Sequence, residues 1–310
     1  MTLNNSLIGL DALTQDQLDA WVSAARTRTQ LGRLPEYIPL LARTKPGTVA
    51  VEIQTIRGNR FAAGEVMQPF ALMSVIKPFL LLFVLERFGA DEVFKQVGMQ
   101  PSDQPFHSLT QLSSDRGHAR NPMINSGAIT LAALLPGRDG ASCCQALCEW
   151  LNRLAVTHLA LDQKMLTSVR SMANESNRAI ANMLSQSGHL TSVELALDIY
   201  NHICCLSGTV RDLARLGLLL AQPPLAIARQ HQQIVNALML TCGLYQASGA
   251  FAVRIGLPTK SGVSGALLSI VPKEGAIAVY GPTIDPTGNS VAGLFLLEKL
   301  ATHLDVSIFG

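Results

Sequence analysis

The chain has 310 residues, of which 48% are hydrophobic and 15% are charged, and its formal net charge is +2. This composition is typical of a globular protein with a large core, and it excludes an intrinsically disordered chain. No run of lysine and arginine is long enough to indicate a nucleic-acid surface, so we expect no nucleic-acid partner.

Two features bear on where the protein works. The N-terminal segment MTLNNSLIGLDALTQDQLDAW lacks a basic region followed by a long apolar stretch, so it does not resemble a secretory signal. The longest apolar runs, such as residues 78–85, are too short to span a bilayer. We therefore expect a soluble, cytoplasmic protein with no membrane partner.

The six cysteines form no CxxC pair, and no histidine lies near them at metal-binding spacing. Adjacent pairs such as Cys204-Cys205 suit neither a set of disulfides nor a zinc site. We expect buried free thiols in a reducing compartment, and we predict no metal and no cofactor.

The first part of the chain predicts a helix followed by a β-hairpin. Residues 13–32 have the apolar spacing of an amphipathic helix that ends at a glycine. Residues 34–42 contain two prolines and are predicted as loop and short turn. β-Branched residues recur at alternating positions along residues 48–56, which predicts a strand. Residues 60–64 form a return strand after a turn, and the two together are typical of an antiparallel hairpin.

The middle of the chain has helical periodicity, and the last third returns to strands. The predicted helices of the middle cover residues 75–88, 125–135, 142–154, 177–186, 192–205 and 209–221. The predicted strands of the last third cover residues 251–255, 264–271 and 275–280, and a final helix covers residues 290–303.

This order of elements predicts an α+β protein (α/β in the broad sense). Its antiparallel sheet of N- and C-terminal strands is flanked by helices, with a central all-helical lobe. We expect a single domain over residues 1–310. The sheet lobe would comprise about residues 34–73 and 243–310, and the helical lobe about residues 74–242. A cleft between the lobes is the expected place for a functional site.

Ser74 and Lys77 form a candidate catalytic pair. Positions i and i+3 share one face of a helix, so the hydroxyl and the amine can meet there. A desolvated lysine is neutral more easily and can then remove the serine proton. Pro78 is tolerated only in about the first helical turn, so the helix should begin near Ser74. On its own, the same pattern also describes a helix start with a solvated lysine.

Longer segments extend this pair into a family resemblance. The SxxK motif together with Lys260-Ser261-Gly262 resembles the penicillin-recognising serine hydrolases. Seven segments are more specifically similar to the serine-dependent glutaminases, and they run in that family's order. They are residues 36–42, 121–129, 177–181, 198–204, 243–249, 256–263 and 288–290.

The resemblance implies a β-lactamase-like fold and the hydrolysis of L-glutamine to L-glutamate and ammonia. It implies that Ser74 is the nucleophile and Lys77 its general base. It also implies that Tyr37 and Tyr245 lie at the reacting carbonyl and help to transfer protons. Amide hydrolysis needs a nucleophile, a base, an acid and oxyanion donors, so these residue types fit the chemistry.

The resemblance also implies a binding site for the substrate. Asn125, Asn177 and Tyr200 would hold its amino-acid end. The backbone N–H groups of Val263 and Ser74 would form the oxyanion hole. From their local sequence alone, both asparagines are better described as helix N-caps, and the tyrosines as core or rim residues; with the resemblance, the binding role is the preferred one. A homodimer or homotetramer is the expected assembly.

One position departs from the family pattern. The family has a glutamate seven residues before Asn177, and this chain has Arg170 there. That glutamate's expected role is to pair with the substrate's ammonium group, which an arginine would repel. Glu175 lies nearby, but its spacing does not fit a simple exchange.

We include Arg170 among the candidate substrate-binding residues and consider two hypotheses. In the first, Arg170 faces solvent and the chain is a divergent glutaminase. In the second, Arg170 faces the pocket and selects an anionic amide without a free amine. Arg170→Glu would then raise glutaminase activity.

Two other classes of protein remain open from the sequence. One is a penicillin-binding or β-lactamase-type hydrolase, although the asparagine-rich block at residues 121–129 does not resemble that group. The other is a degenerate glutaminase that binds an amino acid as a regulatory module. Only Arg170 supports this second alternative.

Overall fold

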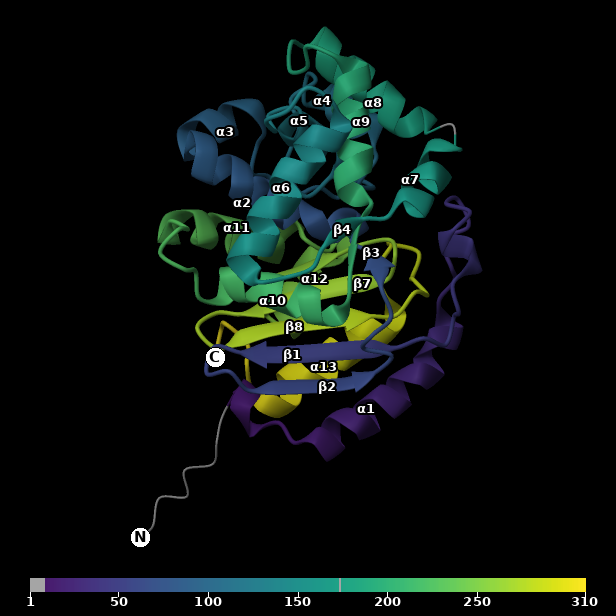
Figure 1. The fold of residues 1–310 in the computed structure, drawn as a ribbon, viewed down its shortest axis with the longest axis vertical. Helices are drawn as coiled ribbons and strands as arrows, with labels where there is room; N and C mark the ends of the chain where they lie inside the picture. Colours follow the sequence, from purple (N-terminus) through teal and green to yellow (C-terminus); the bar gives the residue numbers. More distant parts are fainter. Residues whose placement is uncertain (1–8, 173) are drawn as a thin grey trace.

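The computed structural model describes residues 9–172 and 174–310. A five-stranded antiparallel sheet lies between two groups of helices (Figure 1). In spatial order the strands are β2 (Arg60–Gly64), β1 (Ala50–Thr55), β8 (Gly275–Tyr280), β7 (Ala266–Val271) and β6 (Thr259–Ser261). This order confirms the predicted sheet built from N- and C-terminal strands.

Both faces of the sheet are covered, so nearly every residue of its central strands is buried. Alternation along the strands sends Val51 and Val279 to one face and Ala50 and Ala278 to the other. The valine face packs on two helices and the alanine face on one. These helices are α1 (Gln15–Arg28) and α13 (Val291–Leu304) on the valine face, and α10 (Val210–Ala221) on the alanine face.

Small residues let α10 lie close to the sheet. A Cβ atom at Gly217 would lie 2.4 Å from the Cβ of Ala276. Any larger residue at position 217 would therefore separate the helix from the strands. The helical part of the chain is anchored to the sheet at this contact.

The remaining helices form a layer above α10 (Figure 1). Their bounds are α2 (Lys77–Phe88), α3 (Ala90–Gln96), α4 (Leu109–Ser114), α5 (Asn125–Ala132), α6 (Gly140–Ala155), α7 (Gln163–Arg170), α8 (Glu175–Gln186), α9 (Val193–Cys204), α11 (Arg229–Cys242) and α12 (Ser248–Arg254). Apart from α12, whose Phe251 packs in the core on the valine face, these helices meet in one core with the alanine face of the sheet.

A small second sheet fixes the chain just before Ser74. Its strands, in spatial order, are β3 (Phe70–Ala71), β5 (Leu206–Gly208) and β4 (Ala160–Leu161). The N–H of Leu72 donates to the carbonyl of Leu206 at 2.7 Å, which extends this pairing. The backbone that leads into Ser74 is therefore held by strands that come from the helical part of the chain.

The structure confirms the predicted hairpin, the six central helices and the final helix within a few residues at their ends. The strand predicted for residues 251–255 is wrong, because this segment belongs mainly to α12. Phe251 and Ile255 are four residues apart and pack in the same core, which is helical spacing. A short apolar run does not distinguish a strand from a buried helical turn.

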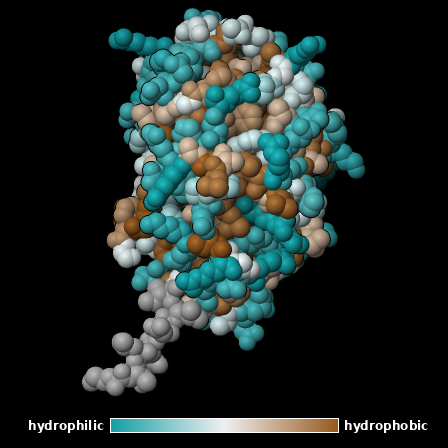
Figure 2. Space-filling view, turned by 60° about the vertical axis from the view of Figure 1, so that its left-hand side comes forward, coloured by the Kyte–Doolittle hydropathy of each residue, from teal (hydrophilic) through white to brown (hydrophobic). Residues whose placement is uncertain are grey.

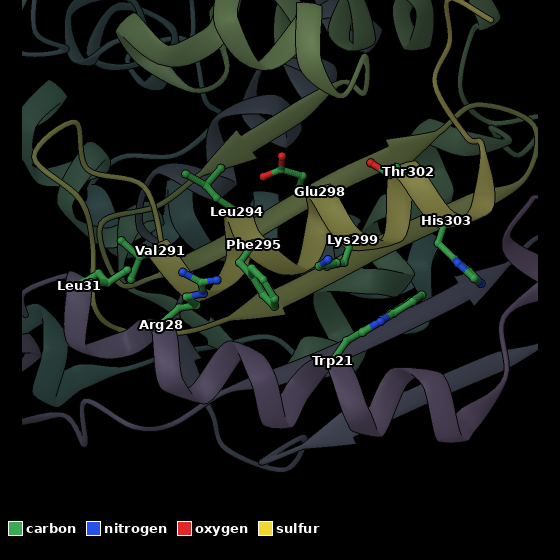
Figure 3. A pocket seen from close by; sticks show the side chains of 10 residues that line it. All are labelled: Trp21, Arg28, Leu31, Val291, Leu294, Phe295, Glu298, Lys299, Thr302 and His303. Atoms are coloured by element: carbon green, nitrogen blue, oxygen red, sulfur yellow. The ribbon is translucent and has the colours of Figure 1, made fainter.

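The molecular surface has an apolar band and an open groove. On the face in Figure 2, hydrophobic side chains gather across the middle, between more hydrophilic parts above and below. The groove measures ≈ 820 Å³ and lies between α1 and α13, with Trp21, Phe295 and His303 along it (Figure 3). Arg28 lies over the Phe295 ring, 5.1 Å from its centroid. None of the predicted site residues lines this groove.

Within the described part of the chain, none of the helices is by itself long and apolar enough to cross a membrane. Only the segments Arg229–Cys242 and Tyr245–Arg254 reach that length and composition together, and a 94° bend separates them.

Candidate active site

A second cavity, of ≈ 540 Å³, contains most of the predicted site residues. Its lining includes six of them: Tyr37, Ser74, Asn125, Asn177, Tyr200 and Val263. Side chains from the helical layer meet here with the loop that follows β6. The site therefore lies where the two parts of the fold join, as the sequence predicts.

Ser74 lies in a single 3-10 turn, Met73–Ile76, that continues directly into α2. Pro78 lies in the first turn of α2. Backbone N–H groups in that turn have no partner within the helix, so the missing N–H of proline costs no helical hydrogen bond. Met73, immediately before Ser74, has a φ of 47°, a conformation that non-glycine residues seldom adopt. Such backbone strain persists only where the surrounding structure enforces it, and it is often found at functional sites. Ser74 keeps 6% of its surface exposed, toward the cavity.

Lys77 is fully buried at the start of α2. Its ammonium group donates to the Oδ1 atom of Asn125 at 2.8 Å and to the carbonyl of Met123 at 3.3 Å. Burial lowers the pKa of Lys77 from 10.5 to about 8. An appreciable fraction of this amine is therefore neutral near physiological pH, as a general base requires. The contacts described for Lys77 include no direct hydrogen bond to Ser74.

Two asparagines and a tyrosine form a buried hydrogen-bonded chain with Lys77. The Asn125 Oδ1 atom also accepts from the hydroxyl of Tyr200 at 3.1 Å, and its Nδ2 donates to Asn177 Oδ1 at 2.8 Å. Neither asparagine is an N-cap, because Ile124 caps α5 and Asn174 caps α8. The helix-cap interpretation of Asn125 and Asn177 is therefore wrong.

Tyr245 lies beside the site, although it does not line the cavity. Its φ of 57° makes it the second strained non-glycine residue here, after Met73. Burial raises the pKa of Tyr245, and hydrogen bonds with Ser74 and the Ser261 carbonyl partly offset that rise. The phenol thus stays protonated and contacts the predicted nucleophile.

Lys260 is a second buried lysine, to which the sequence analysis assigns no role. Its ammonium nitrogen lies 4.2 Å from the centroid of the Tyr245 ring and donates to the carbonyls of Gly243 and Ser261. Desolvation, and the nearby charge of Lys77, hold the pKa of Lys260 well below its ordinary value. The only sequence signal for Lys260 is that it begins the Lys260-Ser261-Gly262 motif, which carries part of the family resemblance.

Gly262 brings the end of β6 against the Ser74 turn. A Cβ atom at this position would lie 2.7 Å from the Leu72 carbonyl and 3.4 Å from the backbone nitrogen of Ser74. Only glycine allows this approach, which sets the backbone of Val263 beside that of Ser74.

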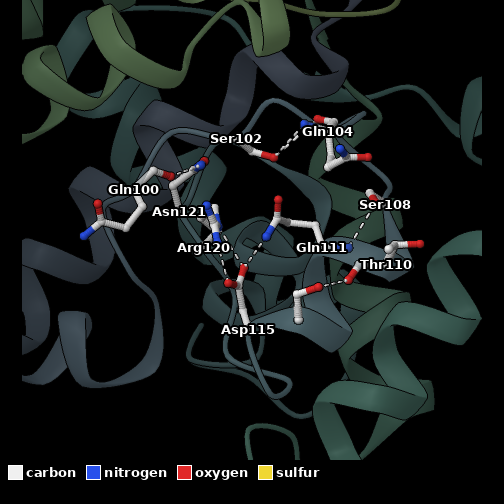
Figure 4. A network of polar contacts seen from close by, with 10 residues as sticks. Gln100, Ser102, Gln104, Ser108, Thr110, Gln111, Asp115, Arg120 and Asn121 are labelled. Atoms are coloured by element: carbon white, nitrogen blue, oxygen red, sulfur yellow. Dashed lines mark hydrogen bonds and ion pairs between the residues drawn. The ribbon is translucent and has the colours of Figure 1, made fainter.

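Asn121 fixes the carbonyl that receives Lys77. Its Oδ1 accepts from the N–H of Met123 at 3.0 Å, and its Nδ2 donates to the carbonyl of Gln100 at 2.7 Å. Figure 4 shows Asn121 within a polar network, beside the pair that Arg120 forms with Asp115. Asn121 is almost fully buried, and its hydrogen bond with Met123 is shielded from water, whereas the one to Gln100 is only partly buried.

We expect Asn121→Ala to lower any turnover that depends on Lys77 by about ten- to a hundredfold, because the loss of the hydrogen bonds with Met123 and Gln100, about 1–3 kcal/mol, releases the Met123 backbone and Lys77. Steady-state kinetics and thermal melting would measure both effects. Gln111→Ala is the matched control, since it removes one polar contact of the same network without touching Met123. Equal loss of turnover in both variants would contradict a specific role for Asn121.

Arg170 lies outside the cavity, at the end of α7. Its side chain is 47% exposed and forms an ion pair with Asp198 on α9. The carboxylate of Asp198 also accepts a hydrogen bond from the N–H of Gly140 at 3.1 Å, so the start of α6 is held by the same carboxylate as Arg170. This placement differs from the expectation that Arg170 binds substrate. The carboxylate of Glu175, at the start of α8, lines the cavity instead.

The geometry corresponds to a known class of fold. The antiparallel sheet, the covering helices and the buried serine-lysine segment define a protein of the serine-dependent β-lactamase-like fold. The chain also matches the model of the Glutaminase family over residues 32–309. It therefore belongs to the glutaminase family and is an amidohydrolase, which confirms the resemblance seen in the sequence.

Individual relatives cover nearly the whole chain. It is 43% identical to a glutaminase from Synechocystis over 94% of this chain and 89% of that protein. It is 38% identical to a Klebsiella pneumoniae glutaminase, over 94% of this chain and 97% of that one. A Bacillus subtilis glutaminase structure superposes with a TM-score of 0.86 at 30% identity, covering 95% and 99% of the two chains. That protein is covalently bound to 5-oxo-L-norleucine, formed from 6-diazo-5-oxo-L-norleucine.

Proposed function

We propose that this chain hydrolyses L-glutamine to L-glutamate and ammonia through an acyl-enzyme on Ser74. The observation that carries the proposal is the cavity in which Ser74 opens beside the buried Lys77, Asn125 and Asn177. The glutaminase relatives, one of them with a covalently bound glutamine analogue, support the same reaction.

The chemistry follows from the protonation states of the site. Neutral Lys77 removes the proton of Ser74, and the serine oxygen attacks the side-chain amide carbon of the substrate. The N–H groups of Ser74 and Val263 stabilise the oxyanion that forms. Tyr245, protonated and in contact with Ser74, relays the proton taken up by Lys77 to the departing ammonia, which leaves Lys77 neutral again. Water then attacks the acyl-enzyme, with Lys77 again as base, and releases glutamate.

The buried polar chain fits the amino-acid end of the substrate. Asn125, Asn177 and Tyr200 present amide and hydroxyl groups to the cavity, and these suit the α-carboxylate and α-ammonium groups. Tyr37, half-exposed at the rim, closes over the reacting carbonyl. Together these contacts would orient the side-chain amide toward Ser74.

Covalent labelling tests the nucleophile directly. The chain is incubated with 6-diazo-5-oxo-L-norleucine, and the adduct is located by peptide mass spectrometry. We expect one adduct, on Ser74, with loss of ammonia release from L-glutamine in the same proportion. An adduct on another residue, with activity retained, would refute the assignment.

The pH dependence follows from the lowered pKa of Lys77. The pKa of Lys77 is about 8, so as the pH falls below 8 the amine is increasingly protonated and cannot accept the serine proton. We expect kcat/KM to rise with pH up to about 8, with a slope of one on logarithmic axes, and to be about a hundredfold lower at pH 6 than on the plateau. A profile that stays flat from pH 6 to 9 would contradict Lys77 as the base.

We further propose that the protein works in the cytoplasm as a homodimer or homotetramer. Only the family resemblance supports this assembly.

A further inference from the structure

One acidic residue, Glu175, lines the cavity among the described residues. Among the described residues that line the cavity there is neither lysine nor arginine, and Glu175 is the only acidic residue. It lies at the exposed mouth, whereas Ser74 and Asn125 lie buried on the floor. A carboxylate at the mouth and a nucleophile on the floor can contact opposite ends of one small molecule.

Glu175 is also without a charged partner among the described residues. The two arginines that flank it in sequence are each held by another carboxylate. Arg170 pairs with Asp198 on α9, and Arg178, one turn along α8, pairs with Glu194. A negative charge that faces a cavity while both neighbouring cations are occupied elsewhere is available to a cationic ligand group.

We propose that Glu175 binds the α-ammonium group of the substrate and so selects free L-amino acid amides over deaminated analogues. This inference rests on the proposed function. Asn177, two residues further along the first turn of α8, belongs to the hydrogen-bonded chain that ends at Lys77. The first turn of α8 thus presents a carboxylate and an amide to the same end of the substrate.

The ion pair between Arg170 and Asp198 has a positioning role in this arrangement. It fixes the end of α7 to α9, just before the segment that leads into Glu175. Val169 and Met172, on either side of Arg170, both line the cavity, although Arg170 does not.

A structural alternative exists for Glu175. A glutamate at the first position of a helix interacts favourably with the helix dipole, whether or not a ligand binds. The test must therefore compare ligands that differ only in the ammonium group. L-Glutamine and its deaminated analogue, 4-carbamoylbutanoate, form one such pair for turnover. L-Glutamate and glutarate form the matching pair for binding.

We expect Glu175→Gln to lower kcat/KM for L-glutamine by about tenfold, mainly through a higher KM, and to leave turnover of 4-carbamoylbutanoate unchanged. Glu175→Asp should restore part of the loss. Glu194→Gln is the matched control, because it removes a carboxylate that supports α8 from outside the cavity. It should leave the preference between the two substrates as in the parent.

Calorimetry with L-glutamate and glutarate gives a readout that does not depend on turnover. The parent should bind L-glutamate more tightly than glutarate, and Glu175→Gln should abolish that difference. If Glu175→Gln lowers the affinity for L-glutamate and for glutarate equally, the residue only supports the helix and the inference is overturned. If the parent distinguishes L-glutamate from glutarate through Glu175 but releases no ammonia from L-glutamine, the inference stands and the proposed function fails.

Discussion

Replacing Ser74 by alanine should lower the rate of ammonia release from L-glutamine by a factor on the order of 10⁴–10⁶. The substitution removes the atom that forms the acyl-enzyme, and no other described hydroxyl in the cavity lies at the start of a helix beside a buried lysine. The alanine side chain fits the same 3-10 turn, so the fold should be retained. A coupled assay for ammonia, together with thermal melting, would measure the two effects separately.

The same variant also separates catalysis from binding. L-Glutamine should still bind to Ser74→Ala, because Asn125, Asn177 and Tyr200 remain in place. Ser114→Ala is a suitable control, since that serine lies on the surface at the end of α4. Ammonia release by Ser74→Ala at the parent rate would exclude the acyl-enzyme mechanism.

Replacing Lys77 by methionine should have opposite effects on activity and stability. Activity should fall by a factor on the order of 10³ or more, because no base remains to activate Ser74. The melting temperature at pH 7 should stay equal or rise, because folding then no longer buries a mostly protonated ammonium group. Melting curves and initial rates of the same preparations would test this.

Lys95→Met gives the comparison for the methionine variant. Lys95 is exposed and pairs only with Glu92 on the surface, so the variant should match the parent in both measurements. A large drop in the melting temperature of Lys77→Met, with the rate preserved, would show that Lys77 is a structural residue.

The sequence predicts the architecture well where the pattern is long and local. The hairpin and the amphipathic helices follow from periodicity alone, and Pro78 places the helix start at Ser74. The pattern fails for residues 251–255, because a short apolar run takes its conformation from what it packs against. The short helices α3, α4 and α7 have too few apolar repeats to stand out in the sequence.

The site is less predictable than the fold, because side-chain placement depends on distant partners. Asn125 and Asn177 have the sequence context of helix caps, and only the fold brings their amides together. Lys260 reaches the site because β6 pairs at the edge of the sheet, next to the turn that holds Ser74. The placement of Arg170 depends on Asp198, which lies on another helix and has no sequence signal that links the two.

The close contact at Gly262 has a consequence for how the protein becomes active during synthesis. Ser74 and Lys77 leave the ribosome early, whereas β6 and Val263 follow only near the end of the chain. Contacts between segments so far apart in sequence form late in folding, after most of the chain has been ordered. A nascent or truncated chain that lacks β6 therefore carries Ser74 without the backbone of Gly262 and Val263 beside it. The surroundings of Ser74 are thus complete only when synthesis of the chain is nearly finished.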